Sequence, residues 1–333
     1  MVPGRRLATV AIVWLTLAGA TAACGGSDES GPSSGARCRS GGPVVALARN
    51  TGGEGIYGVA VAGRTGGLTS VSRDWVATEP AFSPDGRQLV VVRAKGDYES
   101  AGPDSTALWV VGADGRGARA LTAPSDDGVA PQDTGPAWSP DGRTVAFSRV
   151  LPKRLQVAGQ GIASQLMAVP AEGGEAGPLV DNDGAADRAP AWSPDGERLA
   201  FVRARFDPKT DQQTTTVWTA RADGTGARRL ADVYDAESIR WRPDGGALLV
   251  NGRTGIFLVD AATGKPTLLG IDAALAAWAP DGEHLYWWAA GDRWKLVEGR
   301  IVDDHLRADR RVGAIEEAST GMPLFGLAVS PCA

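Results

Sequence analysis

The stretch AWSPDG decides the fold of this chain, and it occurs in identical form at residues 137–142 and 191–196. AFSPDG at 81–86 and AWAPDG at 277–282 are close variants, and IRWRPDG at 239–245 keeps the Pro-Asp-Gly core. In each copy an apolar segment ending in Trp or Phe precedes the turn, and a second apolar segment follows it. Because Pro fixes φ and Gly accepts the positive φ that closes a hairpin, the motif predicts two antiparallel strands joined by a tight turn.

A second repeated segment follows the hairpins. ALWVVGADGRGARAL at 107–121 and TVWTARADGTGARRL at 216–230 are near copies, and each reads as a strand, a Gly-containing turn and a short strand. One unit therefore contains four strands, and the prolines of successive motifs are 37 to 56 residues apart. Four-stranded units at this spacing are typical of β-propeller blades. The strands are apolar on both faces, which suits sheets packed between neighbouring blades.

The chain ends inside a further copy of the motif. LFGLAVSP at 324–331 supplies a first strand, and Cys332 stands where the motif has Asp. The missing second strand is expected in CRSGGPVVALAR at 38–49, with GIYGVAVAG and LTSVS as the third and fourth. We therefore predict an all-β, six-bladed β-propeller with four antiparallel strands per blade, closed by pairing of the C-terminal strand with the N-terminal strands.

Cys38 and Cys332 lie on the two sides of the interrupted turn. In an oxidising compartment we expect them to form a disulfide. In the chain-entropy model, closing so long a loop contributes at most about 5 to 6 kcal/mol. The alternative is a pair of free thiols.

The first residues are typical of an export signal. MVPGRR is positively charged, LATVAIVWLTLAGATAA is apolar, and Cys24 follows directly. The Thr-Ala-Ala before Cys24 resembles a bacterial lipobox, and the alternative is ordinary signal-peptidase cleavage near Ala22 or Ala23. We predict a signal peptide at 1–23, a lipidated Cys24 with a flexible linker at 24–40, and a single propeller domain at 41–333. The protein is then exported and lipid-anchored to the outer face of the cytoplasmic membrane, or secreted or periplasmic if it carries no lipid.

The repeated S-P-D-G turn after an aromatic-ended strand resembles the TolB-like (WD-type, SPDG-repeat) β-propeller family, from Cys38 onward. TolB itself has an α/β domain before its propeller and is not a lipoprotein, whereas here strands are expected within a few residues of the linker. The resemblance therefore implies the propeller alone. Related propellers serve mostly as binding platforms, and a few are enzymes.

The sequence contains few signals for catalysis. Its G-x-S-x-G match, GPSSG at 31–35, lies in the expected polar linker rather than at a strand-to-helix turn, so it is no nucleophile elbow. No C-x-x-C or H-E-x-x-H motif occurs, and the two histidines, His284 and His305, are too few for a three-histidine metal site. We therefore assign no catalytic and no metal-ligating residue, although catalysis by carboxylates alone stays open. The net charge of -5, with no concentration of Lys and Arg, argues against a nucleic-acid partner.

Acidic side chains recur in the loops that connect one unit to the next, on the face opposite the S-P-D-G turns. The candidate binding residues are Asp74, Trp75, Asp126, Asp127, Asp133, Asp181, Asp183, Asp187, Tyr234 and Asp235. Such a rim favours a cationic ligand, a basic protein segment or Ca²⁺. The D-x-D-G sequence at 181–184 resembles part of a calcium loop but lacks the remaining ligands, so no cofactor beyond Ca²⁺ is considered. The alternative is that these residues are ordinary solvated turn residues.

Together these features predict a monomeric, non-catalytic binding or scaffold lipoprotein of the bacterial cell envelope. It would engage a protein or peptide, in particular a basic one, through the acidic loop face. The alternative is an enzyme or sensor acting on a small molecule or cell-wall glycan at the mouth of the propeller channel.

Overall fold

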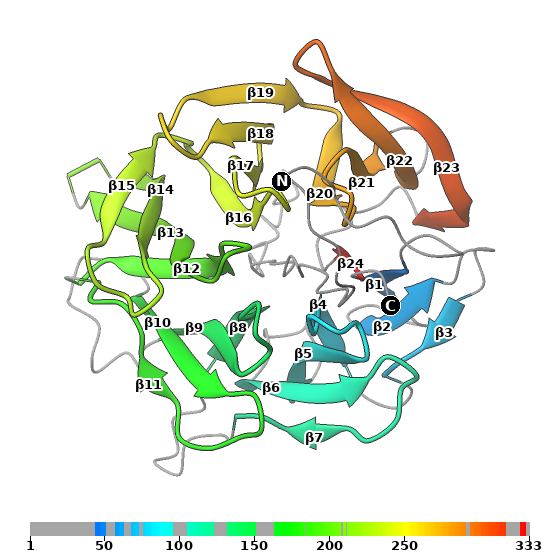
Figure 1. Ribbon diagram of the computed structural model, residues 1–333, viewed down its shortest axis with the longest axis horizontal. Helices are drawn as coiled ribbons and strands as arrows, with labels where there is room; N and C mark the ends of the chain where they lie inside the picture. The colour runs from blue at the N-terminus through cyan, green and yellow to red at the C-terminus, as the bar shows by residue number, and fades with distance from the viewer. Residues whose placement is uncertain are drawn as a thin grey trace, which may run out of the picture.

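The computed structural model describes residues 44–50, 57–62, 68–72, 76–95, 105–122, 132–150, 163–182, 184–207, 209–210, 212–290, 294–317 and 327–330. These residues form twenty-four strands and no helix, arranged as a ring (Figure 1). The prediction of an all-β propeller is therefore confirmed. The predicted signal peptide, Cys24, Cys38 and Cys332 lie outside the described residues, so the signal peptide, lipidation and the disulfide stay predictions.

The strands of the first three blades follow one another along the chain, apart from the last strand, which belongs to blade 1. Blade 1 contains β24 (Leu327–Val329), β1 (Val45–Asn50), β2 (Tyr57–Ala62) and β3 (Leu68–Ser70). Blade 2 contains β4 (Ala77–Phe82), β5 (Gln88–Lys95), β6 (Ser105–Gly112) and β7 (Arg119–Ala120). Blade 3 contains β8 (Gln132–Trp138), β9 (Thr144–Val150), β10 (Ser164–Pro170) and β11 (Gly177–Pro178).

The remaining blades have the same order from the inner to the outer strand. Blade 4 contains β12 (Ala186–Trp192), β13 (Arg198–Asp207), β14 (Gln212–Arg221) and β15 (Arg228–Ala231). Blade 5 contains β16 (Ala236–Trp241), β17 (Ala247–Gly252), β18 (Gly255–Asp260) and β19 (Pro266–Gly270). Blade 6 contains β20 (Ala273–Trp278), β21 (His284–Ala289), β22 (Trp294–Val302) and β23 (His305–Glu317).

Hydrogen bonding divides these strands into four sheets of four strands and one sheet of eight. The sheet of eight consists of blades 2 and 3, which are connected by one parallel pair, Thr106 with Gln132. All other pairings are antiparallel within a blade. The described strands therefore form six four-stranded groups around the ring.

The two ends of the described chain meet in blade 1. β24 pairs antiparallel with β1, with Val329 opposite Val45 and Leu327 opposite Leu47. Just beyond the strands, the Val44 amide donates to Ser330 Oγ at 2.8 Å and the Ser330 amide donates to the Val44 carbonyl at 2.7 Å. The predicted closure of the ring by the C-terminal strand is thus confirmed.

The motif tryptophans hold neighbouring blades together. The indole Nε1 of Trp138 donates to the Ala81 carbonyl at 3.1 Å, so it connects blade 3 to blade 2. Trp241 of blade 5 bonds in the same way to the Ala191 carbonyl of blade 4 at 3.0 Å. Apolar side chains such as Val202 complete the core between the blades. The packing role expected for these tryptophans is therefore the one that the structure shows.

The inner strands β4, β8, β12 and β20 each contain a β-bulge shortly before the motif aromatic. The bulged residue has a positive φ in every case: Glu79 (51°), Gly135 (64°), Ala189 (53°) and Leu275 (50°). Glycine adopts this conformation freely, whereas the other residue types do so at a cost of about 1 to 2 kcal/mol each. The bulge places the side chain of Glu79 at a point where the inner strand bends.

Candidate functional site

The loop face is the side of the ring opposite the S-P-D-G turns. Five of the ten residues predicted to form a binding surface there are described: Asp133, Asp181, Asp187, Tyr234 and Asp235. The other five lie outside the described residues: Asp74, Trp75, Asp126, Asp127 and Asp183. The first group can therefore be placed in the structure, and the second stays a prediction.

Asp133 and Asp187 are fully buried and paired, which corrects the expectation that they present negative charge to a partner. In blade 3 the Asp133 carboxylate accepts hydrogen bonds from Arg149 Nε at 2.7 Å and Nη2 at 2.8 Å. In blade 4 the Asp187 carboxylate accepts two bonds of 2.7 Å from Arg203. Strand pairing causes both arrangements, because each Asp lies directly opposite its Arg on the adjacent strand.

These arginines also stack on aromatic rings. The Arg203 guanidinium lies 4.4 Å from the ring centroid of Trp218, and Arg149 lies 5.2 Å from that of Phe147. In blade 2 Arg93 stacks on Trp109 at 4.3 Å, but Ala77 stands opposite it instead of Asp. This row of arginines was not predicted, although VVVRA, AFSRV and AFVRA place an Arg at the same position of three units.

A charged network spans the junction of blades 4 and 5 on the loop face. Arg188 is buried, and its Nη2 donates to the Ala236 carbonyl at 3.2 Å. Burial lowers the pKa of Arg188 to about 9, and the nearby Glu237 carboxylate opposes that shift. Arg253 lies 3.4 Å from Asp235 and 3.7 Å from Glu237, so acidic and basic groups alternate here. The loop face at this junction of blades 4 and 5 therefore carries both charges and is not purely acidic.

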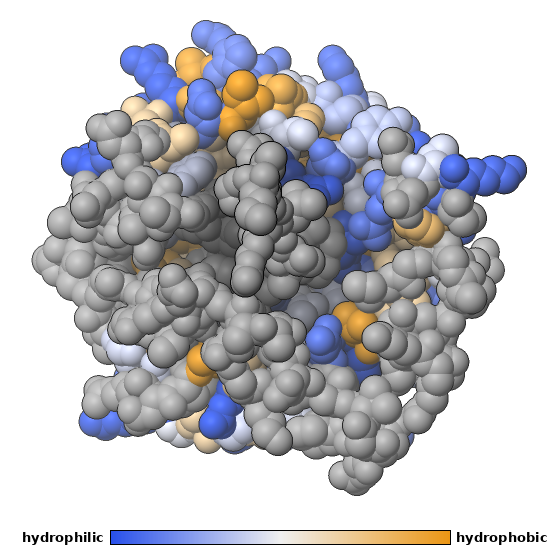
Figure 2. Space-filling view, turned by 180° about the vertical axis from the view of Figure 1, so that it is seen from behind, coloured by the Kyte–Doolittle hydropathy of each residue, from blue (hydrophilic) through white to orange (hydrophobic). Residues whose placement is uncertain are grey.

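Tyr234 stands next to this network in the loop between β15 and β16, and it is 62% exposed. Asp181 is exposed as well, and its backbone carbonyl accepts a 2.9 Å bond from Arg203. Figure 2 views the molecule from this side, and hydrophilic side chains predominate among the described residues in view. An exposed aromatic ring beside fixed charges is a feature of protein interfaces.

Two ionisable residues on the inner strands are buried, and their burial was not predicted. Glu79 is fully buried; its Oε2 accepts a 2.6 Å bond from the Gly135 amide, and its Oε1 has no partner in the described part of the chain. Burial raises the pKa of Glu79 to about 8, against the effect of that hydrogen bond. At neutral pH the side chain is therefore largely protonated. A carboxyl with such a pKa is able to give or take a proton near neutrality.

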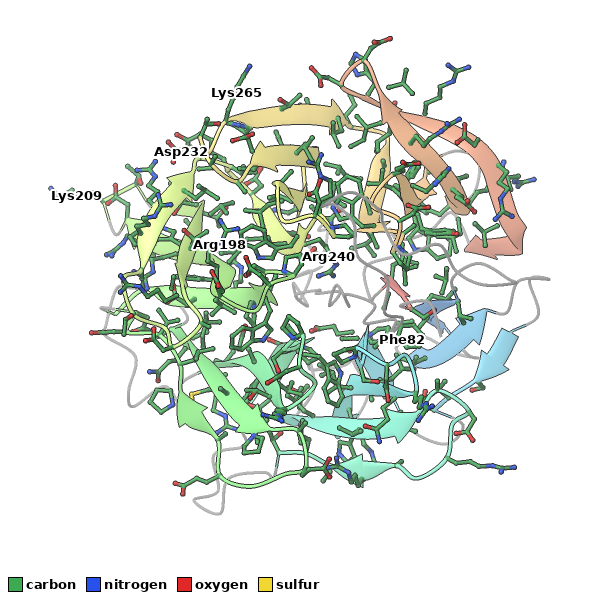
Figure 3. All side chains as sticks on the ribbon, viewed as in Figure 1. Phe82, Arg198, Lys209, Asp232, Arg240 and Lys265 are labelled. Carbon is green, nitrogen blue, oxygen red and sulfur yellow. The ribbon has the colours of Figure 1, made fainter. Side chains whose placement is uncertain are left out.

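Arg240 occupies a position where the other inner strands have alanine: Ala81, Ala137, Ala191, Ala277 and Ala328. Its side chain lies on the inner side of β16, toward the middle of the ring (Figure 3). Nη1 donates to the Ile239 carbonyl at 2.8 Å, while Nε and Nη2 have no partner among the described residues. Burial lowers the pKa of Arg240. The signal in the sequence was this single departure from the Ala of the repeat.

Within the described residues, no three His, Cys, Asp or Glu side chains gather closely enough to hold a metal ion. His284 is engaged in its own turn, where Nδ1 lies 2.8 Å from Asp281 Oδ2. The proposed calcium loop is not tested, because Asp183 lies outside the described residues. The part of the chain that is described also contains no helix with the length and apolar character needed to cross a membrane.

Comparison with known proteins supports the fold more strongly than any one activity. No family model matches the chain. The Uncharacterized peptidase YuxL of Bacillus subtilis is 27% identical over 214 residues, which are 62% of this chain and 28% of YuxL. The chain therefore spans less than a third of that relative.

Among solved structures, the putative TolB from Agrobacterium tumefaciens matches with a TM-score of 0.55 at 14% identity, over 86% of this chain and 96% of that one. Oligogalacturonate lyase from Vibrio parahaemolyticus matches with a TM-score of 0.50 at 13% identity, over 73% and 71%. At these identities the likeness concerns the fold alone. The chain has a TolB-like β-propeller fold, which is found in proteins of different function.

Proposed function

We propose that this chain is a non-catalytic binding or scaffold protein of the bacterial cell envelope, which holds a protein or peptide segment on its loop face. The TolB-like fold supports a binding role. The observation that carries the proposal is Tyr234, a large side chain that is 62% exposed beside the charged network of Asp235, Glu237 and Arg253.

Tyrosine is enriched at interfaces because it offers a large apolar area and a hydroxyl group with little loss of side-chain entropy. The charges beside it are already held in ion pairs, so less side-chain ordering is left to be done on binding. Because Arg149 and Arg203 neutralise Asp133 and Asp187, the face is less acidic than the sequence indicated. The partner segment is then expected to carry polar groups in addition to basic ones.

The predicted export features complete this proposal. Lipid on Cys24 would anchor the protein on the outer face of the cytoplasmic membrane, and the linker to residue 40 would let the propeller reach its partner. A Cys38–Cys332 disulfide would close blade 1 covalently. The protein acts as a monomer in this scheme, because a propeller offers its loop face without needing a second copy.

A photo-crosslinking experiment on the full chain tests the proposal. A photoreactive phenylalanine analogue replaces Tyr234 in one variant and Leu268, which is 45% exposed, in a control variant. We expect a discrete crosslinked protein only from position 234, reduced by Asp235→Lys and reproduced when the purified partner is added back. Equal crosslinking from both positions, or none from position 234, contradicts the proposal.

Glu79 favours a second candidate function, an enzyme or sensor that acts on a small molecule or a cell-wall glycan at the channel mouth. Its pKa of about 8 suits a general acid, and so does its Oε1, which has no partner among the described residues. The relative YuxL is described as an uncharacterized peptidase. Turnover of cell-wall fragments or peptides by the chain, lost in Glu79→Gln while folding is kept, would favour this alternative. A turnover rate unchanged in Glu79→Gln would exclude this residue from the chemistry.

A further inference from the structure

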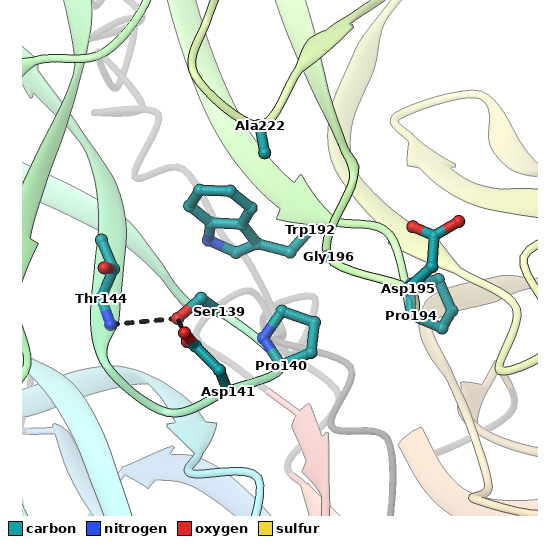
Figure 4. A pocket seen from close by; sticks show the side chains of 9 residues that line it. All are labelled: Ser139, Pro140, Asp141, Thr144, Trp192, Pro194, Asp195, Gly196 and Ala222. Carbon is teal, nitrogen blue, oxygen red and sulfur yellow. Dashed lines mark hydrogen bonds between the residues drawn. The ribbon is translucent and has the colours of Figure 1, made fainter.

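A pocket opens on the turn face between the S-P-D-G turns of blades 3 and 4, on the opposite side from Tyr234. Its volume is about 560 Å³, within the usual range for ligand sites. The lining residues are Ser139, Pro140, Asp141, Thr144, Trp192, Pro194, Asp195, Gly196 and Ala222 (Figure 4). The pocket thus combines one indole ring with two carboxylates.

Trp192 is the motif tryptophan that this pocket leaves uncovered. Trp138, Trp241 and Trp278 are buried, whereas Trp192 is partly exposed. Its Nε1 donates to the Ala137 carbonyl at 3.3 Å, so the indole is fixed in place like those of Trp138 and Trp241. The exposed part of the ring is therefore a rigid surface in the pocket.

The next junction of the ring shows the same place filled. Arg198 of blade 4 lies over Trp241 of blade 5, with its guanidinium carbon 4.6 Å from the ring centroid. A Cβ atom added at Gly245 would lie 3.9 Å from Arg198 Nη2, which places the guanidinium beside the turn of blade 5. Arg198 thus covers the face of Trp241 that corresponds to the exposed face of Trp192.

Thr144 is the residue of blade 3 that corresponds to Arg198. The two backbone amides make the same bond to the turn serine, Thr144 to Ser139 at 3.0 Å and Arg198 to Ser193 at 2.8 Å. The two side chains therefore start from equivalent places. Threonine is too short to reach across the neighbouring indole, and the position that Arg198 fills in one junction is empty in the other.

The carboxylates make this pocket suitable for a cation. Asp141 accepts hydrogen bonds from the Ser139 hydroxyl and the Arg143 amide, and the first of these bonds chiefly lowers the pKa of Asp141. Partial burial raises the pKa of Asp195, but bonds from the Ser193 hydroxyl and the Glu197 amide outweigh that effect and leave it below its usual value. Both groups are therefore ionised at neutral pH, and these bonds use only the Oδ1 atom of each.

We propose that this pocket binds the arginine side chain of a partner protein or peptide, with its guanidinium stacked on Trp192 and its charge facing Asp141 and Asp195. The Arg198–Trp241 stack is the internal template for the complex. Arginine suits the pocket better than lysine because its planar guanidinium stacks on an aromatic face. The site is separate from the loop face, so either proposal can fail without the other.

Titration of the full mature chain with N-acetyl-arginine amide tests the site. The signal is the indole N–H resonance of Trp192 in a ¹⁵N spectrum, assigned with Trp192→Phe. We expect a saturable shift of that resonance, and binding at least about tenfold weaker for the neutral isostere N-acetyl-citrulline amide. An equal response to both probes, or no saturable shift, overturns the proposal.

Two variants exchange the filled and the empty junction. Thr144→Arg should fill the pocket from within and abolish the shift at Trp192. Arg198→Thr should open the second junction and add an arginine-dependent shift at the Trp241 indole. Unchanged resonances of the other indoles show that each variant is folded. A full Trp192 response in Thr144→Arg, or no second response in folded Arg198→Thr, contradicts the proposal.

Discussion

The buried charges of blade 4 and blade 5 both lie on the innermost strand of their blade, at different positions of the repeat, and have different surroundings. In blade 4 Asp187 accepts two hydrogen bonds from Arg203, which also stacks on Trp218. In blade 5 Arg240 is buried with two donor groups that have no partner among the described residues. The charge that recurs in the repeat thus receives its counter-charge from the adjacent strand, whereas the charge that departs from the repeat finds no counter-charge among the described residues.

The largest effect should come from breaking the pair in blade 4. Asp187→Ala leaves the Arg203 guanidinium buried without a counter-charge, and we expect the free energy of unfolding to fall by about 3 to 5 kcal/mol. Denaturant unfolding followed by tryptophan fluorescence measures this change. The double variant Asp187→Ala, Arg203→Met is the control and should recover much of the loss. A loss below about 1 kcal/mol would show that the pair does not stabilise the blade.

A smaller effect, which depends on pH, should follow from Glu79, another buried ionisable group without a full set of partners among the described residues. Its pKa is raised from 4.5 to about 8, so the folded state binds a proton that the unfolded state releases above pH 4.5. Stability should therefore be highest below pH 4.5 and fall as the pH rises toward 8.

Glu79→Gln removes this titration, since the amide keeps an acceptor for the Gly135 amide and carries no charge. At pH 7 we expect the variant to be more stable than the parent by about 3 kcal/mol, and the two to converge near pH 4. Unfolding curves at several pH values provide the measurement. A parallel pH dependence in both proteins would contradict the raised pKa.

The smallest effect should come from restoring the repeat in blade 5. Arg240→Ala removes two donors that have no partner among the described residues, and it introduces the residue found in the other inner strands. The free energy of unfolding should therefore rise by about 1 to 2 kcal/mol. The indole of Trp278, which also lacks a partner among the described residues, is expected to bond to the carbonyl of residue 240. A shift of the Trp278 indole resonance would report that bond.

Ala191→Gly in blade 4 is a control that should lower stability. Destabilisation by Arg240→Ala would show that the arginine has a structural partner.

The fold could be predicted from the sequence because the same strand-turn-strand pattern recurs in successive units. The S-P-D-G turn, the aromatic residue before it and the apolar strands on either side recur often enough to define a blade. The unfinished motif at Cys332 was enough to predict the pairing of β24 with β1, which the structure confirms. The turn chemistry and the repetition predict the same architecture, so tertiary contacts did not change the strand assignments that the sequence indicates.

The candidate sites were less accessible to sequence reasoning. Asp133 and Asp187 resemble solvated turn residues until strand pairing places Arg149 and Arg203 opposite them. The pocket over Trp192 exists because Thr144 is too short to cover the indole. In the sequence, a threonine at this position does not indicate a pocket. It does so only once the structure shows Arg198 covering the indole of Trp241 at the next junction. Such features depend on differences between units, whereas the fold depends on what the units share.

The pairing of β24 with β1 also determines when the ring can be completed during synthesis. β24 emerges after all the other described strands, so the edge of β1 that it covers stays unpaired until then. An exposed strand edge is a template for association with another chain. A nascent or truncated copy that lacks these few residues would therefore be prone to aggregate, although nearly all of its blades were already present.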